Sequence, residues 1–316
     1  MKAAKFAALR LAFAAALGLA AAPPAPAFDY ALEPRQIAPD TWVVEGAQED
    51  FSPRNGGNIV NTAFIVTGEG VVLIDSGPSL GYGRALAAAI RRITDQPVRT
   101  VFITHRHPDH FLGNQAFPAA AIAALPKTIA AIRRDGNALA ENLYRMVGDP
   151  MAGTEASAPT LEAIRGPWPI GGHALELIAL SGHTDADLMI FDRSTGVLFA
   201  GDLAFHDRTP TTPHADIDDW LHALTVIRAL RPSLLVPGHG PVSGDLQALD
   251  QTSRYLGWLQ ATLRDASQRG LDTTEVLALP LPEDLRRLAV SQAEFRRAVL
   301  QYYPRFEQEA LARGSR

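Results

Sequence analysis

The chain contains no cysteine, and this is the most consequential absence among its 316 residues. Disulfide bonds are therefore impossible, and a metal site in this protein has no thiolate ligands. Stability must come from a packed core and from any bound metal ion. With 47% hydrophobic residues, the chain is long enough for one large globular domain or for one domain with an appendage.

The sequence also lacks concentrated positive charge. Its formal net charge is −5, and basic residues form only short groups such as Arg91-Arg92 and Arg133-Arg134. A nucleic-acid-binding surface needs a basic patch or stripe, and these pairs do not provide one. We expect a small-molecule substrate and no nucleic-acid partner.

A long apolar run is missing too, although a short one lies near the N-terminus. Three basic residues in the first ten positions precede an uncharged, Ala- and Leu-rich run over residues 11–22. Ala25-Pro26-Ala27 then supplies small residues at a signal-peptidase site. Because the run is short for a membrane span, we interpret residues 1–27 as a signal peptide and predict the periplasm as destination. We expect no membrane association after cleavage; an uncleaved anchor is the alternative.

What the sequence does have is a dense group of metal-binding side chains, His105-Arg106-His107-Pro108-Asp109-His110. Imidazole and carboxylate together suit zinc and its neighbours. Three further candidates follow apolar runs or lie between glycines, and seven ligands suit two neighbouring ions better than one tetrahedral ion. The predicted ligands are His105, His107, Asp109, His110, His183, Asp202 and His239.

Each group of ligands follows a run expected to form a buried strand, so we expect the loops at one sheet edge to converge on the site. These runs are residues 98–104, 175–180, 197–200 and 234–236.

The ligands divide between two ions. We assign His105, His107 and His183 to the first ion and Asp109, His110 and His239 to the second, with the Asp202 carboxylate bridging both. A hydroxide held between the ions forms near neutral pH, because binding lowers the pKa of water to roughly 7. Asp109 is the candidate catalytic residue, since its carboxylate can orient this hydroxide or carry its proton. We predict two zinc ions, and iron or manganese accepts the same ligands.

Other polar residues have weaker settings. Asp75 ends the expected strand of residues 71–74, and we interpret it as a carboxylate that hydrogen-bonds the ligand loop. His206 is a candidate for the wall of a cleft. No ligand role is predicted for the remaining histidines His173, His214 and His222.

In order and spacing, these motifs resemble the metallo-β-lactamase superfamily over residues 38–245. The resemblance implies a four-layer αββα sandwich with the site at one edge of two sheets. Asp202 looks like the bridging aspartate of glyoxalase II-type hydrolases, and the lack of cysteine excludes the pattern of the largest lactamase subclass.

A finer resemblance is carried by three segments, residues 55–58 (NGGN), 75–79 (DSGPS) and 110–117 (HFLGNQAF). They are similar to the SoxH-related quinoprotein relay system zinc metallohydrolases. That similarity implies a link to a periplasmic quinoprotein dehydrogenase system. Residues 55–58 are either a mobile flap over the cleft or an ordinary hairpin loop.

We expect residues 28–245 to form the metallo-β-lactamase-like domain and residues 246–316 a C-terminal helical extension, in which Pro304 kinks or splits the second helix. Packing of this extension on the sandwich is the default expectation. Dimerisation and a roof over the cleft are the alternatives.

The leading functional hypothesis is an exported dinuclear hydrolase of an ester, thioester, lactone or amide. One alternative is an oxidoreductase of the persulfide-dioxygenase kind, with a single iron held by His105, His183 and Asp202. A β-lactamase and a non-catalytic metal-dependent binding module are the others.

Overall fold

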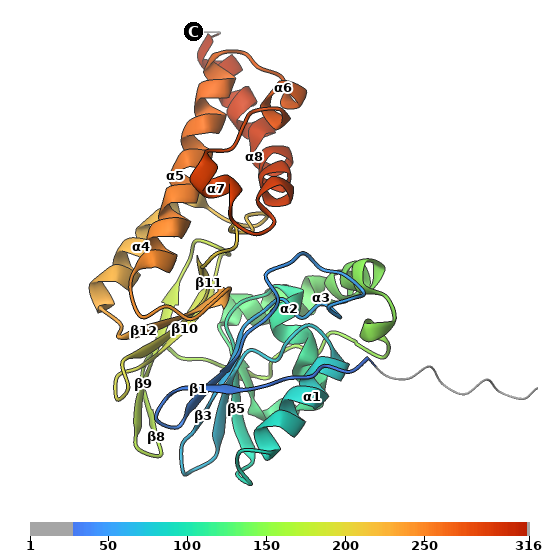
Figure 1. The fold of residues 1–316 in the computed structure, drawn as a ribbon, viewed down its shortest axis with the longest axis vertical. Coiled ribbons are helices and arrows are strands. Elements are labelled where there is room, and N and C mark those ends of the chain that lie inside the picture. Colours follow the sequence, from blue (N-terminus) through green and yellow to red (C-terminus); the bar gives the residue numbers. More distant parts are fainter. Residues whose placement is uncertain (1–27, 315–316) are drawn as a thin grey trace, which may run out of the picture.

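Two β-sheets form the centre of the computed structural model, which describes residues 28–314 (Figure 1). The predicted signal peptide, residues 1–27, lies outside the described residues. One sheet has the strand order β1-β2-β3-β4-β5-β6-β7 and the other β12-β11-β10-β9-β8. The strands are β1 Arg35–Ala38, β2 Thr41–Val44, β3 Thr62–Val66, β4 Val71–Ile74, β5 Val98–Ile103, β6 Ile122–Ala124, β7 Leu161–Glu162, β8 Gly166–Ile170, β9 His173–Leu180, β10 Asp187–Asp192, β11 Val197–Phe205 and β12 Leu234–His239.

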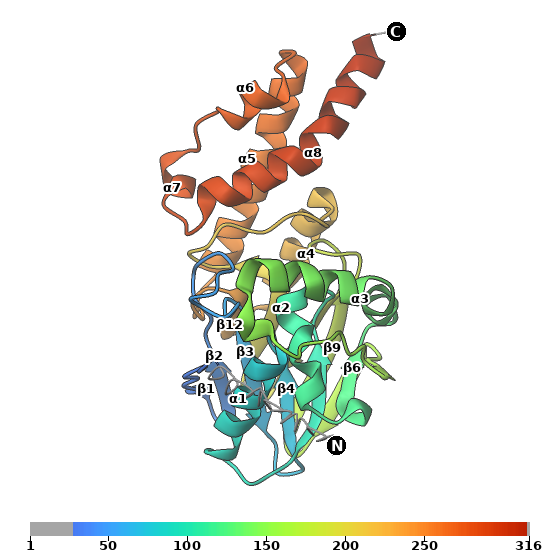
Figure 2. The same ribbon diagram turned by 90° about the vertical axis from the view of Figure 1, so that its right-hand side faces the viewer.

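Helices cover the outer face of each sheet, which gives four layers (Figures 1 and 2). α1 and α3 pack on the first sheet, and α4, α5 and α8 pack on the second. A third apolar cluster fills the space between the sheets and includes Phe102 of the first sheet and Leu188 and Phe199 of the second. The α-helices are α1 Leu80–Arg91, α2 Pro108–Phe111, α3 Pro126–Val147, α4 Ile217–Leu230, α5 Gln247–Gln268, α6 Thr273–Leu277, α7 Glu283–Arg286 and α8 Ser291–Gly314.

Both sheets contain parallel and antiparallel neighbours. β4, β5, β6 and β7 run parallel, as do β11 and β12, and the other neighbours are antiparallel. Layers cover both faces of β4, so all four of its residues are buried and apolar. The αββα sandwich expected from the sequence is confirmed.

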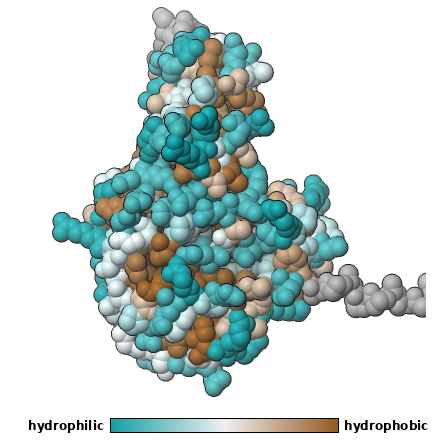
Figure 3. Space-filling view, in the orientation of Figure 1, coloured by the Kyte–Doolittle hydropathy of each residue, from teal (hydrophilic) through white to brown (hydrophobic). Residues whose placement is uncertain are grey.

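The C-terminal helices share a core with the second sheet. Leu256 and Leu259 of α5 and Phe295 of α8 lie in one buried cluster with Phe205 of β11. Pro304 lies inside α8, which continues through it, and the break falls instead at residues 287–290, between α7 and α8. Figure 3 shows a largely hydrophilic surface where the extension meets the sandwich, so on this face the apolar contacts are inside. Among residues 28–314, no helix has the length and apolarity to cross a bilayer.

Because α5 and α8 share this cluster with β11, Leu256→Ala should lower the free energy of unfolding by about 2–5 kcal/mol. The loss should appear in urea unfolding as a shifted but still single transition. Leu300→Ala, at a position of α8 that is 61% exposed, is the matched control and should change stability by about 0.5 kcal/mol or less. Separate transitions for helices and sandwich would contradict a shared core.

Candidate metal centre

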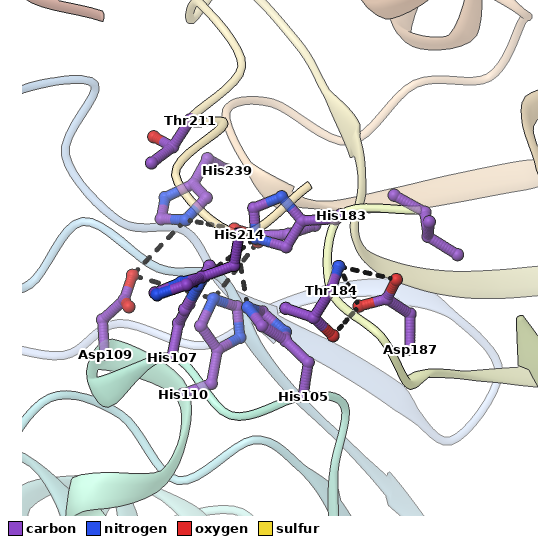
Figure 4. Close-up of polar contacts among 12 residues, drawn as sticks. His105, His107, Asp109, His110, His183, Thr184, Asp187, Thr211, His214 and His239 are labelled. Atoms are coloured by element: carbon purple, nitrogen blue, oxygen red, sulfur yellow. Dashed lines mark hydrogen bonds and ion pairs between the residues drawn. The ribbon is translucent and has the colours of Figure 1, made fainter. Parts of the chain in front are cut away.

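The seven predicted ligands meet at one edge of the sandwich, and six of them are labelled in Figure 4. They form two adjacent groups of buried side chains. Within each group, the donor atoms lie within 4.8 Å of one another. The first group is His105, His107, His183 and Asp202, and the second is Asp109, His110 and His239.

Strand ends position these donors. The histidine cluster follows β5, His183 lies in the turn between β9 and β10, and His239 ends β12. Asp202 lies inside β11, where that strand bulges: Gly201 to Phe205 of β11 pair with only Pro237 to His239 of β12. Bulges next to active sites re-aim side chains, and this one lies at the only predicted ligand within a strand interior.

Asp202, a member of the first group, also faces the second. Its Oδ1 is 3.2 Å from Nε2 of His110, in the second group. Its Oδ2 is 3.2 Å from Nε2 of His183, in the first group, and 3.3 Å from Nε2 of His239, in the second. One carboxylate thus faces donors of both groups with its two oxygens.

Close packing explains the glycine before His239. A Cβ atom on Gly238 would lie 1.9 Å from Oδ1 of Asp202, which is far inside van der Waals contact. Only glycine lets β12 approach the carboxylate this closely.

Hydrogen bonds outside the donor groups fix the rings. Nδ1 of His110 lies 2.7 Å from Asp75, and Nδ1 of His239 lies 2.7 Å from the backbone oxygen of Ile59. Thr104 donates to both oxygens of Asp75 through its N–H and its hydroxyl. When Nδ1 of a ring is hydrogen-bonded, its Nε2 is left to bind a metal ion. The site therefore has the hydrogen bonds that orient metal-binding histidines. Asp75 makes the contact expected from the sequence.

Unpaired buried atoms show that the residues fit metal ions. Within residues 28–314, the buried atoms without a hydrogen-bond partner include Nε2 of His105, Nε2 of His110 and Oδ1 of Asp202. Buried polar atoms of this kind normally have partners. Metal ions between the two groups would satisfy all three.

The electrostatics favour cations at the same place. Burial, with help from the neighbouring rings, lowers the pKa of His105 and His107 well below the usual value, so both rings are neutral and able to bind metal. Burial alone would raise the pKa of Asp202, but the surrounding imidazoles, His239 first, hold it well below its usual range. Burial likewise opposes a proton on His110, yet Asp202 and Asp75 raise its pKa. The field that favours a proton there also favours a metal cation.

His214 is a site residue that the sequence did not reveal. Its Nδ1 lies 2.8 Å from Nε2 of His107, whose Nδ1 lies 2.8 Å from Nε2 of His183. His214 is in the loop before α4, far along the chain from His107, and no motif surrounds it. His206 bonds the backbone oxygen of Pro241 and is not among the residues that line the cleft.

A cleft of about 300 Å³ opens beside the donors. Asp109, Asp202 and His239 line its floor, and α3 supplies an apolar wall with Leu139 and Met146. Glu294 and Arg297 of α8 also line it, so the C-terminal helices reach the site. Asp50, Phe51 and Ile59, rather than residues 55–58, bring the loop after β2 to the cleft.

Residues 55–239, more than half of the chain, match the family model described as the metallo-beta-lactamase superfamily. The chain belongs to this superfamily. Its two groups of histidine and aspartate donors are consistent with a dinuclear metal site.

Curated relatives agree with this assignment. The chain is 27% identical over 183 residues to the Beta-lactamase-like protein 2 homolog of Caenorhabditis elegans, covering 58% of this chain and 56% of that relative. It is 25% identical over 195 residues to metallo-beta-lactamase IND-1 of Chryseobacterium indologenes, covering 58% of this chain and 73% of the relative. A segment of 49 residues, 16% of this chain and 9% of the relative, is 41% identical to the linear primary-alkylsulfatase of a Pseudomonas species. The chain thus spans little more than half of the length of the first relative.

Solved structures share the fold. A metallo-beta-lactamase from Pontibacter korlensis has a TM-score of 0.57 at 24% identity and covers 72% of this chain and 99% of its own. The sec-alkyl sulfatase PisA1 has a TM-score of 0.61 at 20% identity and covers 86% of this chain and 50% of its own. That larger share of this chain extends the similarity into the C-terminal helices.

Asp75→Asn should weaken metal binding by about 10–100-fold, because it removes the charge that orients His110. Competition with a chromogenic chelator measures the affinity. Asp192→Asn is the matched control: Asp192 bonds Nδ1 of His173 at 2.8 Å and is equally buried, but this pair lies outside the donor groups. Equal losses in the two variants would contradict a specific role for Asp75.

Proposed function

We propose that this protein is an exported, metal-dependent hydrolase that holds two metal ions and cleaves an ester, thioester, lactone or amide. One observation carries the proposal: Asp202 faces two groups of buried donors, with one oxygen 3.2 Å from His110 and the other 3.2 Å from His183. A carboxylate that faces both groups could be shared by a pair of metal ions, and a single ion would not need the second group.

Each predicted ligand then has a role. His105, His107 and His183 would hold the first ion, Asp109, His110 and His239 the second, and Asp202 both. When bound, the metal ions supply a Lewis acid and a nucleophilic hydroxide at neutral pH. Histidine and aspartate ligands suit zinc, and iron or manganese can bind to the same ligands.

Asp109 combines two tasks in this proposal. Its Oδ2 lies 3.4 Å from Nε2 of His239, and the residue also lines the cleft. A carboxylate in that position can orient the attacking water and accept its proton before passing it to the leaving group. The low exposure of Asp109, 5%, strengthens its interactions with nearby charges.

The cleft supports a small-molecule substrate, because about 300 Å³ matches the lower end of small-ligand sites. Export is supported by the N-terminal sequence, and a periplasmic quinoprotein system as partner by the similarity to the SoxH-related group. These two parts of the proposal rest on the sequence.

A second candidate is hydrolysis of an alkyl sulfate. Two matches favour it: the 41% identity to an alkylsulfatase over 49 residues, and the fold shared with PisA1 over 86% of this chain. A lactamase activity has the support of the 25% identity to IND-1.

Elemental analysis of the mature protein should find two metal ions per chain, with zinc predominant. The same preparation should hydrolyse members of a panel of esters, thioesters and lactones, lose this activity to a chelator, and regain it with added metal. One iron per chain with oxygen uptake would overturn the proposal in favour of an oxidoreductase. Turnover confined to a carbapenem or to an alkyl sulfate would favour those classes.

Asp202→Ala should lower kcat/KM on the best substrate by more than about 100-fold, because a metal ligand contributes more than the residues that orient it. His206→Ala is the control, since His206 bonds Pro241 outside the cleft, and it should retain most of the activity. An Asp202 variant with intact hydrolysis would favour a non-catalytic binding module.

A further inference from the structure

The cleft beside the metal centre has apolar lining residues that take no part in the proposed chemistry. They include Phe51 from the loop after β2 and Leu139 and Met146 of α3. Asp109 lines the same cleft. Figures 1 and 2 both show α3 beside α2, the short helix that carries Asp109. Apolar side chains and a candidate metal centre therefore share one cleft.

Leu139 and Met146 are aligned along α3. Met146 lies seven positions after Leu139, close to two helical turns, so the two side chains form a line with about 10 Å between them. Asn142 also lines the cleft, but a rotation of about 60° from Leu139 places it to the side of this line. The two apolar side chains thus form a strip, and a strip suits a chain of several carbons.

The apolar side chains of this strip are accessible. Met146 is 38% exposed, and it belongs to none of the three apolar clusters within residues 28–314. Leu139 and Phe51 are half-buried, because each packs on the core beside the first sheet and also lines the cleft. Single apolar residues are common on protein surfaces, but these three gather in one cleft. Covering them with an apolar group would remove their surface from water, which is favourable.

The charged side chains that line the cleft outside the donor groups are already paired. Arg297 contacts both Asp50 and Glu294, and Arg208 lies 3.4 Å from Glu294. These two positive and two negative side chains balance, so this part of the cleft favours neither an anion nor a cation. The hydroxyl of Thr211 donates to Glu294 as well. A ligand group that extends beyond the metal centre therefore gains most from apolar contact.

We propose that Leu139, Met146 and Phe51 form a subsite for an uncharged hydrocarbon chain. The preferred substrates then carry an apolar chain of several carbons next to the bond that is cleaved. This chain lies along α3 while the reacting group is at the metal centre. The inference rests on the proposed function for the reacting group, and it names the substrate class of that site.

Binding of product-like ligands tests the subsite without turnover. The metal-loaded protein is titrated calorimetrically with straight-chain monocarboxylates from acetate to decanoate, each below its micelle-forming concentration. Every added methylene should tighten binding by about two- to fourfold, fourfold being the effect of complete burial, until the chain outgrows the cleft. The heat-capacity change of binding should become more negative in step, because apolar surface is buried.

Two ester series then identify the side of the scissile bond that carries the chain. One series varies the acyl group with a fixed alcohol, and the other varies the alcohol with a fixed acetyl group. A rise of kcat/KM with chain length in either series supports the subsite and identifies that side. No rise in both series would contradict it.

Two variants of α3 locate the effect. Met146→Gln, with a side chain of similar length but polar, should weaken octanoate binding by about threefold or more and leave acetate binding unchanged. Tyr144→Gln is the matched control, since Tyr144 is 48% exposed on the same helix and is not among the residues that line the cleft. It should change neither affinity. Both positions are exposed, so both variants should keep the Tm of the wild type, which checks their folding.

Other results would overturn the inference. Equal affinity for acetate and octanoate would show that the strip does not contact the chain. Tighter binding of a dicarboxylate than of the monocarboxylate of equal length would show that charge selects the ligand. Equal losses in Met146→Gln and Tyr144→Gln would show adsorption on the outer surface of α3. Chain-length-dependent binding without hydrolysis of any ester would support the subsite and refute the proposed function, so the two failures are distinct.

Discussion

The structure depends on the burial of one carboxylate, Asp202, among imidazole rings. An ionised group in a protein interior is stable only when opposite charge and hydrogen bonds surround it. Here the rings supply the polar atoms, but Oδ1 of Asp202 and Nε2 of two rings remain without hydrogen-bond partners among the described residues. Donor atoms from both sheets therefore surround a candidate cation site. Burying them without partners costs free energy, which bound metal ions would offset.

The sandwich supplies the rigidity that this arrangement requires. The histidine cluster leaves the first sheet, and Asp202 and His239 belong to the second, so the site forms only where the two sheets meet. Apolar residues packed between the sheets hold the two sheets in position. Asp75 hydrogen-bonds the ring of His110, and Thr104 hydrogen-bonds Asp75. The bulge of β11 and the missing side chain of Gly238 complete the fit.

The helical extension contributes side chains to the cleft beside the metal centre. Its core joins the second sheet, and the start of α8 places Glu294 and Arg297 in the lining of the cleft, together with Leu139 and Met146 of α3. The metal-donor groups lie on the sandwich, whereas Glu294 and Arg297 of the cleft lining come from the helical extension.

The sequence alone predicted much of this. The fold followed from the family resemblance that the motifs carry. The gathering of the seven predicted side chains was predictable because metal chemistry allows few residue types and the strand-end rule places them together. Even Asp75 was predictable from its position at the end of β4. The sequence also contains the start of the helical extension as a change in composition near residue 245, which falls between β12 and α5.

Tertiary structure alone decided the rest. His214 contacts His107, and Glu294 contacts Arg208, only because distant segments pack together. The sequence around His214 and around Glu294 contains no motif that indicates a role. The same holds for the choice of Asp50 and Phe51 as cleft residues over residues 55–58. Metal ligands are specified locally by chemistry, whereas the walls of a cleft are specified by long-range packing, which no short pattern encodes.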